Sequence, residues 1–238
     1  MHPQVEKLIS KEYAEQRSEE WLKLRGNMLT ASDAATAIGD NPYEKPEGLI
    51  LKKCGYNKFH GNEFTAHGNK YEDEARDKYC EMYDEVCHEI GLFPHEKYDW
   101  LGGSPDGITE SGRLVEIKCP LTRKIIEEVP EHYMPQLQLL MEILELEVCD
   151  FIQYKPAEVA WPEPEQFLVL TVERDREWFQ KYLPVMDSFW KRVLYHREHG
   201  VDELLPKRKT KTKVATPIKC EITEDPCDDY QPNTDSPE

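Results

Sequence analysis

Hydrophobic and polar residues alternate along this chain with the period of a helix in some segments and of a strand in others. Apolar residues at helical spacing predict helices at residues 18–38 (in two parts), 47–54, 68–83, 132–145 and 175–196. Extended apolar runs predict strands at residues 86–93, 98–101, 114–119, 148–154 and 167–172. Pro184 lies inside the last of these helices, so a kink or a break is expected there.

The strand predicted at residues 114–119 carries its charged residues on one face. Successive side chains of a strand point to opposite faces, so Glu116 and Lys118 share one face. Val115, Ile117 and Cys119 share the other. A carboxylate and an amine are therefore expected side by side on a strand whose opposite face is apolar.

A second carboxylate, Asp106, stands in the turn sequence Ser-Pro-Asp-Gly, because Pro fixes φ and Gly tolerates positive φ. Gly112 then closes a hairpin-like connection into the strand that carries Glu116 and Lys118. Two carboxylates that hold Mg²⁺, with a lysine near the attacking water or the scissile phosphate, suit metal-assisted phosphodiester hydrolysis. The alternative is a surface hairpin with solvated charges, since Glu-x-Lys alone also arises by chance in so charged a chain.

A third carboxylate, Glu72, lies near the start of the helix predicted at residues 68–83. One apolar stripe of this helix consists of three residues at helical spacing, Tyr71, Ala75 and Tyr79. Glu72 lies beside the stripe, where it can turn toward a cleft rather than toward bulk water. The alternative is an ordinary amphipathic helix whose first-turn acids favour the positive end of the helix dipole.

Several short motifs follow one another along the chain. They are Trp21-Leu22-Lys23-Leu24-Arg25-Gly26, Leu29-Thr30-Ala31-Ser32, Gly68-x-x-x-Glu72, Ser104-Pro105-Asp106-Gly107, Glu116-Ile117-Lys118-Cys119-Pro120 and Tyr133-Met134-Pro135-Gln136-Leu137-Gln138. In order and approximate spacing they resemble the YqaJ/lambda-exonuclease family of viral and phage alkaline exonucleases. The resemblance runs from Trp21 to Val193, and ordered motifs are far more specific than any one of them.

The resemblance implies a PD-(D/E)xK restriction-endonuclease-like α/β core, in which a central mixed sheet is flanked by helices. It implies that Asp106, Glu116 and the backbone carbonyl of Ile117 bind metal. It further implies that Glu72 supports a second metal ion and that Lys118 is the catalytic lysine. Lys118 beside divalent metals is expected to have a depressed pKa, which would suit an alkaline optimum.

The resemblance also assigns residues around this centre. Tyr133 and Gln136 match the helix that borders the active site, where the amide can orient the lysine or water. A pocket for the 5′-phosphate of the digested strand is implied for Arg25, Ser32 and Ser104. The family has one more basic residue shortly after Cys-Pro, where this chain has Arg123 and Lys124, and the spacing favours Lys124.

The resemblance implies a Mg²⁺-dependent exonuclease, with Mn²⁺ as the other ion and two ions in the site. It would digest linear double-stranded DNA from 5′ ends and leave 3′ single strands for recombination. A single-strand annealing protein as partner and a toroidal homotrimer are implied in the same way. An endonuclease on the same core stays open, as does a DNA-end-binding subunit without activity, although the intact Asp106, Glu116 and Lys118 count against the latter.

The charge of the chain is unusual for a DNA-binding enzyme. Its 30 basic and 47 acidic residues give a net charge of −17, whereas affinity for duplex DNA comes largely from neutralised phosphates. Local basic residues and bound Mg²⁺ can reverse the sign at the site. The predicted grip on DNA is still modest and salt-sensitive, and a closed ring around the duplex would compensate for it.

The cysteines and the C-terminal composition bear on location and domain organisation. Seven cysteines without a Cys-x₂-Cys pair indicate reduced thiols inside a cell, and no apolar stretch approaches a membrane span. We expect a nuclease domain at residues 1–204 and a flexible tail, basic and then acidic, at residues 205–238. The protein is expected in the cytoplasm or elsewhere inside a host cell, or in the nucleus if the basic run is an import signal.

Overall fold

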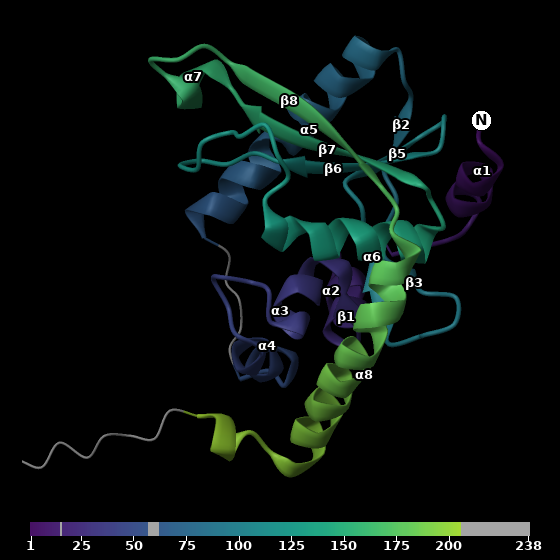
Figure 1. Ribbon diagram of the computed structural model, residues 1–238, viewed down its shortest axis with the longest axis vertical. Coiled ribbons are helices and arrows are strands. Elements are labelled where there is room, and N and C mark those ends of the chain that lie inside the picture. The colour runs from purple at the N-terminus through teal and green to yellow at the C-terminus, as the bar shows by residue number, and fades with distance from the viewer. Residues whose placement is uncertain (15, 57–61, 206–238) are drawn as a thin grey trace, which may run out of the picture. The chain divides into compact units, whose positions relative to one another are not determined.

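A computed structural model describes residues 1–14, 16–56 and 62–205 (Figure 1). Two sheets occur there, with strand orders β2-β5-β6-β7-β8 and β1-β4-β3. The strands are β1 Leu29–Thr30, β2 Cys87–His88, β3 Phe93–Pro94, β4 Leu101–Gly103, β5 Gly107–Thr109, β6 Arg113–Lys118, β7 Val148–Lys155 and β8 Gln166–Glu173. β6 and β7 are parallel and the other pairs of the larger sheet are antiparallel, so the predicted mixed sheet is confirmed.

Helices lie on both faces of the larger sheet, with α5 on one face and α6 on the other (Figure 1). The helices are α1 Pro3–Ile9, α2 Glu19–Gly26, α3 Ala34–Ile38, α4 Pro46–Lys53, α5 Glu63–Tyr83, α6 Met134–Leu144, α7 Ala157–Ala160 and α8 Arg176–His199. Short 3₁₀ helices occupy Ala31–Asp33, Glu131–Tyr133 and Asp202–Leu204.

The apolar stripe predicted on α5 packs against the apolar face of β6. Tyr71, Ala75 and Tyr79 are buried in one cluster with Val115 and Ile117. Helical spacing on one side and strand alternation on the other therefore meet as predicted. This packing fixes α5 next to the strand that carries Glu116 and Lys118.

The opposite face of the sheet is covered by α6, which is buried along most of its length. Leu137 and Leu140 of α6 share the main core with Leu114 and Phe151 of the sheet. α3 and α4 pack against α8, and α3 and α8 also contact α6. The end of β6 is thus packed between α5 on one face and α6 on the other, two helices that lie far apart in the sequence.

The Asp106 turn owes its glycine to close packing. Gly107 does not have a positive φ, as the turn prediction supposed, but begins β5. A Cβ at this position would lie 2.3 Å from Sγ of Cys87, so no larger residue fits unless the side chain of Cys87 shifts. The predicted hairpin turn at Gly112 is confirmed, with φ of 95°.

Some predicted elements differ from the structure. The strand expected at residues 86–93 is reduced to β2 and the start of β3, and the strand expected at residues 98–101 begins only at Leu101. α8 continues through Pro184, so a break there is wrong, whereas a kink within the helix stays a prediction. A proline inside a helix costs about 3 kcal/mol, and burial of Phe179, Met186 and Phe189 on the same helix offsets that cost.

Three further expectations concern membrane-spanning segments, the C-terminal tail and the cysteines. No helix in the described part of the chain is both long and apolar enough to cross a membrane. The predicted tail lies outside the described residues except for Leu205. The five described cysteines are free thiols: Cys54, Cys80, Cys87, Cys119 and Cys149.

Candidate active site

Asp106 is held at the end of β6 by a main-chain donor. It lies between β4 and β5, and β5 pairs antiparallel with β6 so that Gly107 faces Val115. The main-chain N–H of Ile117 donates to Oδ2 of Asp106 at 2.7 Å. The turn therefore brings Asp106 to the strand that carries the other two predicted catalytic groups.

Glu116 is almost fully buried and carries one carboxylate oxygen without a partner. Its Oε1 accepts hydrogen bonds from Nζ of Lys118 and, at 2.5 Å, from Nε2 of Gln136 on α6. The residue is 1 % exposed, and Oε2 is buried with no hydrogen-bond partner among the described residues. The predicted shared face of Glu116 and Lys118 is confirmed, and the solvated surface hairpin is wrong.

The charges of this group act strongly on one another. Burial, and after it the charge of Asp106, raises the pKa of Glu116. Burial alone would lower the pKa of Lys118, but the charges of Glu116 and Asp106 raise it above its usual value. Lys118 is thus an ammonium ion in the metal-free site, and the depressed pKa predicted for the metal-loaded site stays a prediction.

Glu72 faces the same centre from α5. This helix begins at Glu63 rather than at residue 68, so Glu72 lies well beyond its first turn. The dipole alternative, which would explain Asp73 and Glu74 as first-turn acids, is therefore wrong. Burial and the charge of Asp106 raise the pKa of Glu72, while Arg17 at 3.4 Å and Arg76 at 3.9 Å lower it. The carboxylate is therefore directed into a cleft with other acids nearby.

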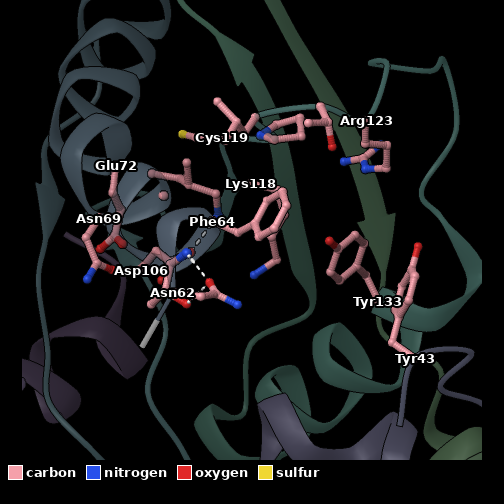
Figure 2. A pocket seen from close by; sticks show the side chains of 16 residues that line it. Tyr43, Asn62, Phe64, Asn69, Glu72, Asp106, Lys118, Cys119, Arg123 and Tyr133 are labelled. Carbon is pink, nitrogen blue, oxygen red and sulfur yellow. Dashed lines mark hydrogen bonds between the residues drawn. The ribbon is translucent and has the colours of Figure 1, made fainter. Parts of the chain in front are cut away.

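A cavity of about 740 Å³ opens next to these residues (Figure 2). Glu72, Asp106 and Lys118 line it on one side, and Arg123 and Tyr133 line it on another. Tyr133 lies between two cations, since its ring centroid is 5.3 Å from Nζ of Lys118 and 5.9 Å from the guanidinium carbon of Arg123. The cavity thus combines an acidic wall, two cations and an aromatic ring.

The residues of this centre fit a divalent cation. In residues 1–14, 16–56 and 62–205, no group of three His, Cys, Asp or Glu side chains is already arranged around a metal position. However, a buried oxygen of Glu116 lacks a partner in the described part of the chain, and the charge of Asp106 raises the pKa of both Glu116 and Glu72. A hard cation with oxygen ligands would satisfy that oxygen and relieve the repulsion, with the backbone carbonyl of Ile117 as a further ligand.

The predicted phosphate-binding residues gather at the ends of two paired strands. β1 and β4 are parallel, with Leu29 opposite Leu101, so Ser32 and Ser104 stand at equivalent positions beyond the two strands. Nη2 of Arg25 donates to Oγ of Ser32 at 2.9 Å. Oγ of Ser104 is buried and has no partner within the described chain. The parallel pairing therefore brings the segments of Ser32 and Ser104, which lie far apart in the sequence, to the same end of the two strands.

The guanidinium of Arg25 is held from several sides. It stacks on Trp21 with 4.4 Å between its carbon and the ring centroid. Burial lowers the pKa of Arg25, whereas the charges of Asp33 and Glu116 raise it. The charges of Asp33 and Glu116 thus favour the cationic form of Arg25.

Arg123, rather than Lys124, lies against the cavity. Its Nη1 donates to Oε1 of the fully buried Gln153 at 2.8 Å, while Nη2 is buried without a described partner. Lys124 is exposed and does not line the cavity. Lys124 was favoured by its distance along the sequence from Cys-Pro alone. The loop after Pro120 is irregular, and Arg123 is the residue of the two that lines the cavity.

Two further cations, Lys53 and Arg197, support the elements around Arg25, and no local sequence pattern indicated either of them. Nζ of Lys53 is 2.8 Å from Oδ2 of Asp33 and donates to the carbonyl of Arg25 at 2.9 Å. Arg197 of α8 donates to the carbonyls of Gly26 and Lys53, at the ends of α2 and α4. Lysines and arginines on amphipathic helices are typical of solvated faces, so only the tertiary structure reveals these contacts.

Residues 20–147 match the family described as the YqaJ-like viral recombinase domain. An uncharacterized protein of Acanthamoeba polyphaga mimivirus is 35% identical over 160 residues, which cover 59% of this chain and 29% of that protein. An African swine fever virus protein is 29% identical over 162 residues, covering 55% of this chain and 46% of its own. The chain thus spans less than half the length of these relatives.

Solved structures show the same fold. An alkaline exonuclease from Laribacter hongkongensis matches with a TM-score of 0.65 and 25% identity, covering 76% of this chain and 95% of the other. The same enzyme in complex with dAMP gives a TM-score of 0.65, 26% identity and the same coverage. A phage-related exonuclease from Haemophilus somnus is alike in fold alone, at a TM-score of 0.52 and 15% identity over 74% of this chain and 95% of its own. The expected core of phage-type exonucleases is therefore confirmed.

Proposed function

This chain belongs to the YqaJ-like viral recombinase domain family, and we propose that it is a divalent-metal-dependent exonuclease acting on linear double-stranded DNA. It digests from the 5′ end and leaves 3′ single strands for recombination. The likeness to alkaline exonucleases supports the activity. The ions are Mg²⁺ or Mn²⁺, two in the site.

One observation carries the proposal. Asp106, Glu116 and Lys118 converge at the end of β6, and the buried Oε2 of Glu116 has no protein partner in the described chain. An unpaired carboxylate oxygen beside a second carboxylate is unfavourable for folding unless a ligand uses it. The unpaired oxygen of Glu116 lowers the stability of the metal-free protein, which is expected of a cation-binding site. A purely structural ion pair would not leave this oxygen without a partner.

The side chains have distinct roles in the proposed hydrolysis. Asp106, Glu116, the carbonyl of Ile117 and Glu72 would hold the divalent ions, which supply an activated hydroxide and stabilise charge on the scissile phosphate. Lys118, which pairs with Glu116, would place its amine beside that phosphate. Gln136 fixes Glu116 through its amide, so the carboxylate keeps one orientation.

The phosphate pocket would make the enzyme work from an end. Arg25 and Ser32 offer a guanidinium and a hydroxyl, and the buried hydroxyl of Ser104 has no other described partner. Charge-assisted hydrogen bonds from such groups favour a terminal phosphate, which carries more charge than an internal one. Anchoring the 5′-phosphate decides which phosphodiester bond lies over the carboxylates. Arg123 would contact the same strand from the cavity wall.

The wider setting is proposed on similar grounds. Residues 1–204 would form the nuclease domain, with residues 205–238 as a separate tail. A homotrimeric ring would keep a chain of net charge −17 on DNA without tight contacts. The viral relatives support action inside a host cell. A single-strand annealing protein is proposed as the partner from the family alone.

A digestion series tests the proposal. The substrates are 5′-phosphorylated linear duplex, 5′-hydroxyl linear duplex and closed circular duplex, each with Mg²⁺ or with EDTA. We expect degradation of linear DNA with Mg²⁺ only, fastest from the phosphorylated end, and an intact circle. Cutting of the circle would favour the endonuclease alternative, whereas binding without cutting would favour a DNA-end-binding subunit.

A further inference from the structure

Arg76 is a buried cation that contacts the segments of two candidate metal ligands. It lies on α5, one turn after Glu72, and its side chain is 8% exposed. Its Nη1 donates to the main-chain carbonyl of Asp106 at 2.9 Å and lies 3.9 Å from Oε1 of Glu72. Its Nη2 pairs with Asp73 at 2.5 Å and with Glu89 at 2.6 Å.

We propose that Arg76 is a positioning residue that sets Glu72 and Asp106 relative to each other, so that both reach the same divalent ion. The inference rests on the proposed function and deepens it. Arg76 itself touches no substrate and acts through the two acids. Since its donors sit in a rigid planar fork, one guanidinium can fix two groups at a defined separation.

The turn that contains Asp106 lies between β4 and β5, so no hydrogen bonds between strands hold its main chain. It therefore needs another contact to fix its position. Its side chain is bound to β6 through the N–H of Ile117. Its main chain is bound to α5 through Arg76. The turn is thus tied to both elements that carry the other carboxylates, and loss of either contact frees it on that side.

The two terminal nitrogens of Arg76 have different kinds of partner. The inner Nη1 faces Asp106, while the outer Nη2 faces carboxylates that are largely exposed, at 76% for Asp73 and 61% for Glu89. The outer pairs balance the charge of Arg76 without being buried. The contact with Asp106 therefore gives the buried side of the guanidinium its specific partner.

Arg113, the first residue of β6, provides a control variant. It binds the buried Asp150 through Nε at 2.5 Å and through Nη2 at 2.6 Å. It donates no hydrogen bond to Asp106 or Glu72. Arg113→Met therefore removes an arginine that pairs with a carboxylate, as Arg76→Met does, without touching the candidate metal ligands.

The test measures Mn²⁺ binding by calorimetry without DNA, on the full chain and its variants, with urea unfolding of each. We expect Arg76→Met to weaken Mn²⁺ binding about tenfold or more, the usual effect of a lost outer contact to a metal ligand. Arg113→Met should destabilise the fold and change Mn²⁺ affinity by less than about twofold. Arg76→Lys keeps the charge but lacks the fork, so its Mn²⁺ binding should stay weak; it serves if Arg76→Met does not fold.

Equal Mn²⁺ affinity of the Arg76 and Arg113 variants would overturn the positioning role and leave Arg76 as a structural ion pair. Full rescue of Mn²⁺ binding by Arg76→Lys would also overturn it, because charge alone would then suffice. A wild-type chain that binds no Mn²⁺ would instead contradict the proposed function. The two failures are therefore distinguishable.

Discussion

Oδ2 of Asp106 accepts a hydrogen bond from the main-chain N–H of Ile117 at 2.7 Å, which joins the turn before β5 to the strand that carries Glu116 and Lys118. This bond uses one carboxylate oxygen and leaves the side chain at the cavity wall. A group at the end of a sheet can thus be placed by the backbone of the strand it serves. The geometry and the charge of Asp106 are therefore separable by mutation.

Asp106→Asn tests this separation. The amide oxygen can still accept the Ile117 hydrogen bond, so the turn should keep its shape, but a metal-binding charge is lost. We expect DNA cleavage to fall roughly a hundredfold or more. Without metal the variant should be as stable as the wild type or more so, because Asp106 repels Glu116 and Glu72. Cleavage rates and urea unfolding check both points; unchanged cleavage would remove Asp106 from the active site.

Lys118→Met should separate binding of metal from hydrolysis. The ammonium pairs with Glu116, and its removal leaves that carboxylate free for a cation. We expect cleavage to be lost while Mn²⁺ binding, measured by calorimetry, persists. Lys78→Met is the matched control, since Lys78 pairs with Glu165 and does not line the cavity. Full cleavage by Lys118→Met would favour the subunit without activity of its own, with a contaminating nuclease as the source.

Arg25→Ala should abolish the preference for a phosphorylated 5′ end. A hydrogen bond to a charged group contributes about 1.5–3 kcal/mol, so the rate on the phosphorylated duplex should fall about tenfold or more. The rate on the 5′-hydroxyl duplex should change little. Lys23→Ala, an exposed charge on the same helix, is the control. Equal losses on both ends would show that the pocket assignment is wrong.

The sequence predicted the charged pair of the site because short-range geometry decides it. A period of two residues places Glu116 and Lys118 on one face, and they form an ion pair there. Helical spacing on α5 likewise placed Glu72 beside the packed stripe. Both inferences need only the periodicity of one element and a buried neighbour.

The sequence did not predict the pairing of strands that lie far apart along the chain. β1 is too short to show alternation, so its parallel pairing with β4 and the resulting approach of Ser32 and Ser104 had no local signal. In the sequence, Arg76 and Lys53 have the pattern of solvated charges on a helix. Their partners, the carbonyl of Asp106 and the carboxylate of Asp33, belong to distant segments. The continuation of α8 through Pro184 likewise depends on tertiary packing.

A pH-dependent stability is expected from Asp150 on β7, away from the cavity. Burial alone would raise its pKa, but hydrogen bonds from Arg113, Tyr79 and Thr171 lower it below the ordinary value. An acid whose pKa is lowered by folding stabilises the protein above its unfolded pKa of about 3.9. That contribution is lost as the pH falls through the folded pKa.

Asp150→Asn should therefore be less stable than the wild type by about 3 kcal/mol at pH 7, because Arg113 loses its charged partner. The difference should shrink as the pH falls below about 4, where the wild type also loses the charge of Asp150. Urea unfolding across this range measures it. A difference that stayed constant with pH would mean that Asp150 has an ordinary pKa in the folded protein.

Crystals soaked in Mn²⁺ and measured for anomalous scattering test most directly whether these acids hold a catalytic ion. We predict an anomalous peak within coordination distance, about 2.0–2.6 Å, of carboxylate oxygens of Asp106 and Glu116 and of the Ile117 carbonyl. The peak should vanish in Glu116→Gln crystals treated in the same way. Absence of a peak in the wild type, or a peak away from these acids, would contradict the account.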